Sequence, residues 1–139
     1  MKIILQDNNN FVLRFDKGDE VITGLAEFMK SQKVGACSFS GIGAASEVAI
    51  GFYNPFLKNF RQKPYAEELE IISLNGTGAL KAGQPAIHAH GMFGRNDFST
   101  LGGHVFKLVV SATCEISLKQ LNGEMKREPN TEVNLDTLV

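Results

Sequence analysis

Apolar and polar residues alternate along much of the chain, and this period of two limits the fold more than any other feature of the sequence. It is clearest over residues 108–119, where every second position is apolar: Leu108, Val110, Ala112, Cys114, Ile116 and Leu118. Successive side chains of a β-strand point to opposite faces of a sheet, so the pattern predicts a strand with one buried and one more polar face. Alternation and short apolar runs recur from Val34 onward, which favours a fold dominated by β-structure.

A single stretch has the spacing of an α-helix. Apolar residues recur every three or four positions there: Val21, Ile22, Leu25, Phe28 and Met29. We expect this helix to run to about Lys33. Asp16 is the expected N-terminal cap, because an aspartate side chain can accept hydrogen bonds from the free N–H groups of the first turn. The sequence therefore predicts one α+β domain, a mostly antiparallel β-sheet with one principal α-helix packed on it.

Strands and turns follow from the apolar runs and the turn-forming residues between them. Strands are expected over residues 2–6, 11–15, 35–40, 48–52, 56–62, 69–80, 86–93 and 108–119. The glycine-rich segment over residues 41–45 predicts a tight connection between two strands. After Gly123 the sequence becomes polar, so the expected domain covers residues 1–123 and a loose polar C-terminal tail covers residues 124–139.

Composition and charge restrict the range of functions. The chain has 139 residues, with 14 basic and 15 acidic side chains and a net charge of −1. Avid sequence-independent binding to DNA needs clustered cations, so it is not expected. The only apolar run near the start, Ile3–Leu5, is much shorter than a signal-peptide core or a membrane span, which predicts a cytoplasmic protein without a membrane partner. Cys37 and Cys114 are interpreted as buried reduced thiols, with a disulfide or a reactive thiol as the alternatives.

All three histidines of the chain lie within one short region, at His88, His90 and His104. The first two form a His-x-His pair on a predicted strand, and residues two apart in a strand share a face with α-carbons about 6.5–7 Å apart. His104 follows two glycines and opens the next strand-like stretch, so a neighbouring strand can bring it to the same face. Three imidazoles that leave a coordination position open are typical of a divalent metal site, with zinc favoured. The alternative is three hydrogen-bonded or solvent-facing imidazoles.

Three charged residues are candidates for the surroundings of this site. Glu47 and Glu115 are the carboxylates to test first as a fourth metal ligand or a proton-transfer group, with a solvent-facing glutamate as the plainer interpretation of each. Arg95 lies between the second and third histidines and can bind the carboxylate or phosphate of an anionic small molecule, with a polar turn as the plainer interpretation. The glycine-rich segment lacks the spacing of a phosphate-binding loop. The basic pair Lys126 and Arg127 is interpreted as part of a solvated face.

Four blocks of sequence occur in an order and spacing that resemble a known family. They are Phe11–Val21, then Ser38–Ala44 with Glu47 and Gly51–Tyr53, then Leu69–Gly76, and finally Gly83–His90 with Gly102–His104. Together they resemble the PPC domain, the domain conserved in plants and prokaryotes, and the match covers roughly residues 11–123, nearly the whole chain. The resemblance implies an α+β domain that assembles into a homotrimer. It also implies that His88, His90 and His104 match the metal-binding histidines of some prokaryotic members.

The same resemblance makes DNA a candidate partner. Plant members join the domain to an Arg-Gly-Arg-Pro segment that enters the minor groove of DNA, and stand-alone prokaryotic members share the DNA-binding description. This chain contains no Arg-Gly-Arg-Pro segment. Two functions are therefore expected in order: a homotrimeric regulatory or interaction module associated with DNA and carrying a metal, or a small metal-dependent enzyme acting on an anionic small molecule through metal-activated water or a polarised carbonyl.

Overall fold

Nine strands and one helix make up the computed structural model, which describes residues 1–139. In chain order the elements are β1 (Lys2–Asp7), β2 (Asn10–Asp16), α1 (Val21–Ser31), β3 (Cys37–Asn54), β4 (Asn59–Tyr65), β5 (Leu69–Lys81), β6 (Gln84–Gly94), β7 (Thr100–Gln120), β8 (Lys126–Asn130) and β9 (Leu135–Leu138). Every strand pair is antiparallel except β5 with β8. The predicted class, a mostly antiparallel sheet with one helix, is confirmed.

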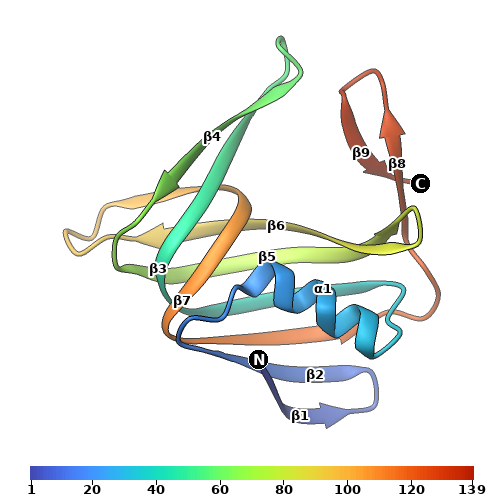
Figure 1. The fold of residues 1–139 in the computed structure, drawn as a ribbon, viewed down its shortest axis with the longest axis horizontal. Coiled ribbons are helices and arrows are strands. Elements are labelled where there is room, and N and C mark those ends of the chain that lie inside the picture. Colours follow the sequence, from blue (N-terminus) through green and yellow to red (C-terminus); the bar gives the residue numbers. More distant parts are fainter.

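The long strands connect different parts of one sheet, in the order β1-β2-β7-β3-β5-β8-β9. Residues 37–45 of β3 pair with β5, and residues 48–54 pair with β4. Since β6 pairs with both β5 and β7, the strands β3, β5, β6 and β7 form a closed circuit of neighbours. Figure 1 shows how the β3–β4 hairpin rises away from the layer that holds α1. The helix packs against β5, β6 and β7 on the core face of the sheet, the helix-covered part, and His88 and His90 of β6 lie on the opposite face, the histidine part.

The glycine-rich segment over residues 41–45 lies inside β3, so the predicted tight connection is wrong. A β-carbon added to Gly43 would lie 2.2 Å from the carbonyl oxygen of Thr113 on β7, and one added to Gly41 would lie 2.9 Å from that of Glu115. These glycines therefore allow β3 and β7 to approach closely. A glycine in a strand can mark such a close approach as well as a turn.

Glu20 caps the helix, and the prediction of Asp16 as the cap is wrong. The Glu20 carboxylate accepts hydrogen bonds from the backbone N–H groups of the second and third helical residues, at 3.1 and 2.8 Å. It also accepts one from the backbone N–H of Leu108, at 2.9 Å, which ties the start of α1 to β7. The helix ends at Ser31, two residues before the predicted end. No helix here has the length and apolar character that crossing a bilayer requires.

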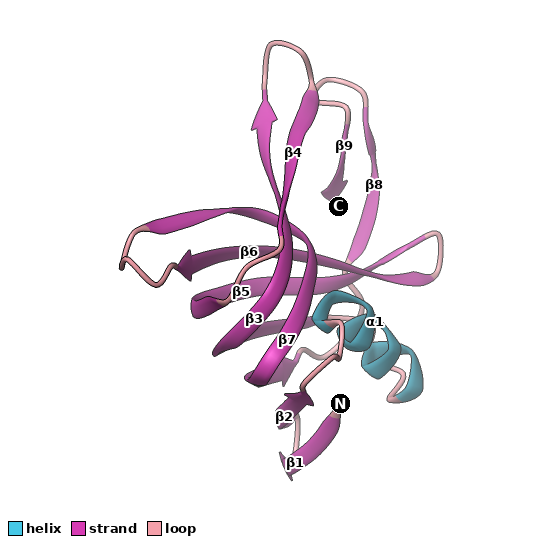
Figure 2. Cartoon of the chain, turned by 60° about the vertical axis from the view of Figure 1, so that its left-hand side comes forward, coloured by secondary structure: helices cyan, strands magenta, loops and turns pink.

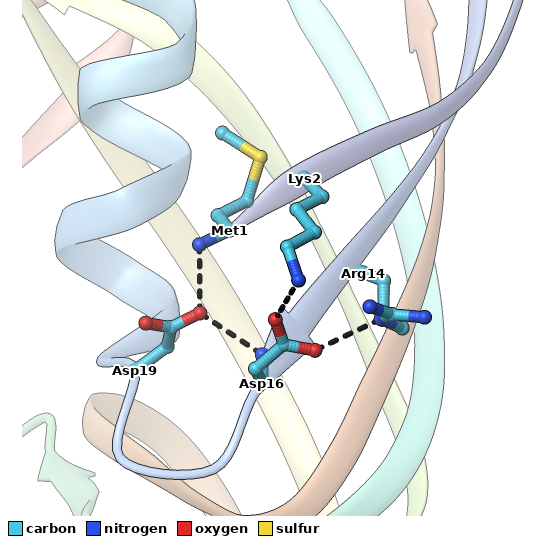
Figure 3. Close-up of polar contacts among 5 residues, drawn as sticks. All are labelled: Met1, Lys2, Arg14, Asp16 and Asp19. Atoms are coloured by element: carbon cyan, nitrogen blue, oxygen red, sulfur yellow. Dashed lines mark hydrogen bonds and ion pairs between the residues drawn. The ribbon is translucent and has the colours of Figure 1, made fainter.

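Asp16 belongs instead to a small ionic cluster that joins β1, β2 and the turn before the helix (Figure 3). Its carboxylate lies 2.9 Å from Lys2 Nζ and 2.9 Å from Arg14 Nε. Asp19 lies 2.7 Å from the amino group of Met1 and accepts a hydrogen bond from the backbone of Asp16. The ion pairs lower the pKa of the Asp16 carboxyl, chiefly through the hydrogen bond from Lys2.

The apolar core lies between α1 and the sheet (Figure 1). The helix buries Val21, Leu25, Phe28 and Met29. Phe28 meets Phe11 of β2 edge to face, with ring centroids 5.1 Å apart. Burying each large apolar side chain contributes about 1.5–3 kcal/mol. Five of the six alternating apolar residues expected on one face of β7 are buried, and only Ala112 is exposed, beside an irregularity in the β3–β7 pairing.

Two strands form after Gly123, so the expectation that this segment is loose is wrong. β8 and β9 make a hairpin, and β8 pairs with the end of β5 where Lys126 and Arg127 meet Leu80 and Lys81. The turn of this hairpin contacts the β3–β4 hairpin: the Tyr53 hydroxyl donates to the carbonyl of Val133. Figure 2 shows the two hairpins projecting from the same side of the molecule. The segment is thus folded against the rest of the chain.

Candidate metal centre

The three histidines converge as their spacing predicts. His88 and His90 lie on β6, and His104 on β7 is the register partner of His90. The potential ligand atoms of the three rings lie within 4.8 Å of one another. Their ring centroids are separated by 5.1 to 5.4 Å. The His-x-His spacing and the short β6–β7 hairpin are enough to bring the rings together.

Alternation along β6 decides which face carries the rings. Ala89 and Phe93 are buried in the core, and Ile87 packs against it. His88 and His90 point to the opposite face, together with the 44% exposed Met92. This arrangement agrees with the prediction that a core face and a histidine face share one strand.

Of the three imidazole rings, that of His104 has the most buried surroundings. Phe60 of β4 and Phe106 of β7 flank it, with ring centroids at 4.9 and 4.5 Å. Burial lowers the pKa of His104 to about 4, with the nearby charges of His88, His90 and Arg127 adding to the effect. Its Nδ1 atom is buried without a hydrogen-bond partner. The ring is therefore held neutral, which is the form that binds a metal ion.

Arg127 lies beside the cluster, although the sequence analysis placed it on a solvated face. Its Nη2 atom is 3.3 Å from Nδ1 of His88. Burial, the Arg127 charge and then His90 lower the pKa of His88. The β8–β9 hairpin brings Arg127 to this position, and no local sequence pattern marks that pairing.

The donor set fits a divalent metal ion of the zinc type. Zinc sites use imidazole nitrogens at about 2.0–2.1 Å, so two ligands of one ion lie at most about 4.2 Å apart. The present limit of 4.8 Å means that small rotations of the side chains would bring the three nitrogens to one ion. A buried imidazole nitrogen without a partner, as in His104, is the kind of group that a metal would satisfy. The three rings would hold the ion and leave a coordination position open.

The other candidate residues lie outside this group. The Glu47 carboxylate is 2.9 Å from Lys107 Nζ. Glu115 is exposed on β7. Arg95 follows β6 in the chain, and its guanidinium forms an ion pair with Glu67, with Nη2 and Oε1 3.1 Å apart. The same group lies over the ring of Tyr65. The only group of three or more histidine, cysteine or acidic side chains with converging ligand atoms is that of the histidines.

Both cysteines are buried and unpaired, as expected. Burial raises the pKa of the Cys37 thiol to about 11. Burial and the charge of Glu115 raise that of Cys114 to about 12. Neither thiol is therefore a nucleophile at neutral pH, because the reactive form is the thiolate.

Fold and histidine cluster define the class: a one-domain α+β protein with a candidate metal centre on one face of its sheet. The profile of the Plants and Prokaryotes Conserved domain, the domain called PPC above, matches residues 5–122. The chain therefore belongs to this family.

Several solved structures are similar over nearly the whole chain. One, described as a "putative DNA-binding protein" from Bacteroides thetaiotaomicron, is 26% identical with a TM-score of 0.93, and the match covers 97% of this chain and 94% of the other. Another, from Ralstonia eutropha and described in the same words, is 30% identical with a TM-score of 0.90 and the same coverage. A metal-containing protein from Archaeoglobus fulgidus is 30% identical with a TM-score of 0.89, and the match covers 100% of this chain and 99% of the other. A search of curated proteins finds no match.

Proposed function

We propose that the protein binds one divalent metal ion, zinc in the first instance, through His88, His90 and His104. The observation that carries this proposal is the convergence of three imidazoles from two paired strands on a half-buried face. The lowered pKa values of His88 and His104 support it, because protons then compete less with the metal. The whole-length similarity to a metal-containing protein supports it as well.

Elemental analysis of the purified protein tests the metal directly. We expect about one zinc ion per chain after equilibration with zinc and removal of the excess, and loss of that zinc in His88→Ala and His104→Ala. Glu47→Gln and Glu115→Gln are the controls, and both should keep the zinc. Loss of zinc in one of them would mean that its carboxylate is the fourth ligand. Unchanged zinc content in both histidine variants would contradict the site.

We propose further that this metal centre belongs to a homotrimeric regulatory or interaction module that associates with DNA. Family resemblance supports the trimer, and the DNA-binding descriptions of two similar structures support the nucleic-acid partner. A cytoplasmic location is part of the proposal, and the two buried unpaired thiols suit a reducing compartment. Sedimentation should show a trimer, and a stable monomer at micromolar concentration would contradict it.

Charge sets the expected strength of the DNA interaction. The net charge of −1 predicts weak binding that falls further as salt is added, because it depends on a local patch of cations. A gel-shift assay at low salt with AT-rich duplex tests this interaction. Absence of any retardation would remove DNA from the proposal and leave the metal centre unaffected.

A metal-dependent enzyme acting on an anionic small molecule is the second candidate. The observation in its favour is a cavity of about 240 Å³ that reaches both His88 and His104. A zinc ion bound there would supply Lewis-acid chemistry to a ligand in the cavity. His88, His90 and His104 would hold the ion, and Phe60 would exclude water from one side.

A further inference from the structure

We propose that the cavity between the histidines and the β8–β9 hairpin binds a small carboxylate, with Arg127 as the residue that recognises it. The inference rests on the proposed metal centre and names the ligand class of that same site. It assigns a role to a part of the chain for which the sequence predicted only a tail.

The cavity is open to solvent on one side and has room for a small ligand. Its volume is about 240 Å³. Its walls come from β4, β5, β6, β7 and the C-terminal hairpin. Phe60, Ala86 and Leu135 give it an apolar part, and His88, His104 and Arg127 give it a polar part. A short acid with an apolar tail matches both parts.

The charges of the wall favour an anion. Lys81 and Asp136 lie 2.6 Å apart, so these two charges neutralise each other. The guanidinium of Arg127 has no counter-ion, because no carboxylate of the chain lies within ion-pair distance of it. Arg14 and Arg95, by comparison, each face a carboxylate, at 2.9 and 3.1 Å. A bound divalent ion would add two further positive charges to the wall around the cavity.

The hydrogen bonds of Arg127 leave it poorly satisfied. Nη1 donates to the backbone carbonyl of Asp136 at 3.0 Å, which holds the side chain in place. Nη2 has only long contacts, 3.4 Å to the Thr77 hydroxyl and 3.3 Å to His88 Nδ1. Nε is buried and has no partner. A guanidinium in this state can gain short, charge-assisted hydrogen bonds from a carboxylate.

The C-terminal hairpin fixes Arg127 from two sides. β8 pairs with β5 at Arg127 itself. At the other end of the hairpin, Asn134 donates to the carbonyl of Lys58, at 3.1 Å. Figure 2 shows this hairpin beside the β3–β4 hairpin. The guanidinium is thus placed next to the histidines by the backbone as well as by its own contacts.

Ligand-detected NMR with butyrate on the zinc-equilibrated protein tests the inference at constant ionic strength. Butyrate carries a carboxylate and a short apolar tail, and butyramide is its neutral counterpart. We expect butyrate to bind and butyramide not to bind. Arg127→Gln should weaken butyrate binding about tenfold or more. Arg127→Lys should have a smaller effect, because lysine keeps the positive charge but lacks the two parallel N–H groups with which a guanidinium binds a carboxylate. Lys126→Gln, next in sequence and exposed, should bind butyrate like the original protein.

Two measurements on the same samples separate the inference from the metal proposal. Zinc content should be the same in Arg127→Gln and the original protein, since all three histidines remain. Butyrate binding that is unchanged in Arg127→Gln and Arg127→Lys, or weakened equally in Lys126→Gln, would overturn the role of Arg127. Binding of inorganic phosphate without butyrate would overturn the ligand class. Absence of zinc from the original protein would contradict the metal centre instead.

Discussion

The helix-covered part of the sheet and the histidine part are built on opposite principles. In the first, large apolar side chains such as Phe15, Leu25 and Ile116 are fully buried, and no polar residue is buried with them. In the second, His88, His104 and Arg127 are half-buried and His90 is exposed. Two of the three buried side-chain polar atoms without a partner lie there, on His104 and Arg127. Unsatisfied buried polar groups destabilise a fold, and the metal ion and carboxylate proposed for this site would offset part of that cost.

The largest expected effect lies in the helix-covered part. Phe15→Ala should lower the free energy of unfolding by about 3–5 kcal/mol, because it leaves a cavity in a fully packed region. Phe98→Ala removes the same ring where it is 93% exposed and should change the free energy by no more than about 0.5 kcal/mol. Urea denaturation of both variants measures the difference. Similar values for the two would show that the core is not where the stability resides.

A pH-dependent loss of stability should identify the histidine part. The pKa of His104 is lowered from 6.5 to about 4 in the folded protein, so the unfolded chain binds a proton first as the pH falls. The stabilisation from the neutral ring is fully present above about pH 6.5 and is lost between there and about pH 4. The free energy of unfolding of the zinc-free protein should therefore fall in this window, less so in His104→Gln.

The aspartates with lowered pKa values do not confuse this measurement. Asp16, Asp19 and Asp97 are shifted downward from 3.8, so they titrate below the window. Identical pH profiles for the original protein and His104→Gln between pH 6.5 and 4 would contradict the burial of this ring.

A smaller effect is expected where the helix joins the sheet. Glu20→Ala removes the cap of α1 and the hydrogen bond to Leu108, and should lower the free energy of unfolding by about 1–2 kcal/mol. Glu27→Ala, on the exposed side of the same helix, is the control and should cost less than about 0.5 kcal/mol. Equal effects in thermal or urea unfolding would mean that Glu20 does not act as a cap.

The smallest effect concerns the ion pair of Lys107 with Glu47, the carboxylate predicted from the sequence to lie near the site. Lys107 and Glu47 lie 2.9 Å apart with side chains 46% and 39% exposed, and exposed pairs contribute about 0–1 kcal/mol. Lys107→Ala should therefore change stability by less than about 1 kcal/mol and leave the zinc content unaltered. A loss of zinc in this variant would connect Glu47 with the metal centre.

Local pattern was enough to predict the helix-covered part and the convergence of the histidines. The helical spacing of its apolar residues identified α1, and the spacing of His88 and His90 put two rings on one face. The third ring followed because β6 and β7 are joined by a short turn. All of these depend on neighbours in sequence.

The predictions that were wrong concern residues in contact with parts of the chain that are distant in sequence. Gly43 lies beside Thr113 of β7, and a glycine chosen for close approach has the same sequence signature as one in a turn. Glu20 caps α1 in place of Asp16 while it also binds the backbone of β7. Arg127 reaches the histidines through the parallel pairing of β8 with β5, where it meets Lys81. Each of these contacts joins residues far apart in the sequence, so no local pattern predicts it.

X-ray absorption at the zinc edge of the zinc-equilibrated protein tests the central claim most directly. We expect about one zinc ion per chain with three imidazole nitrogens at about 2.0–2.1 Å, and a fourth ligand such as water in the open position. A spectrum without imidazole scattering, or a protein that retains no stoichiometric zinc, would contradict it.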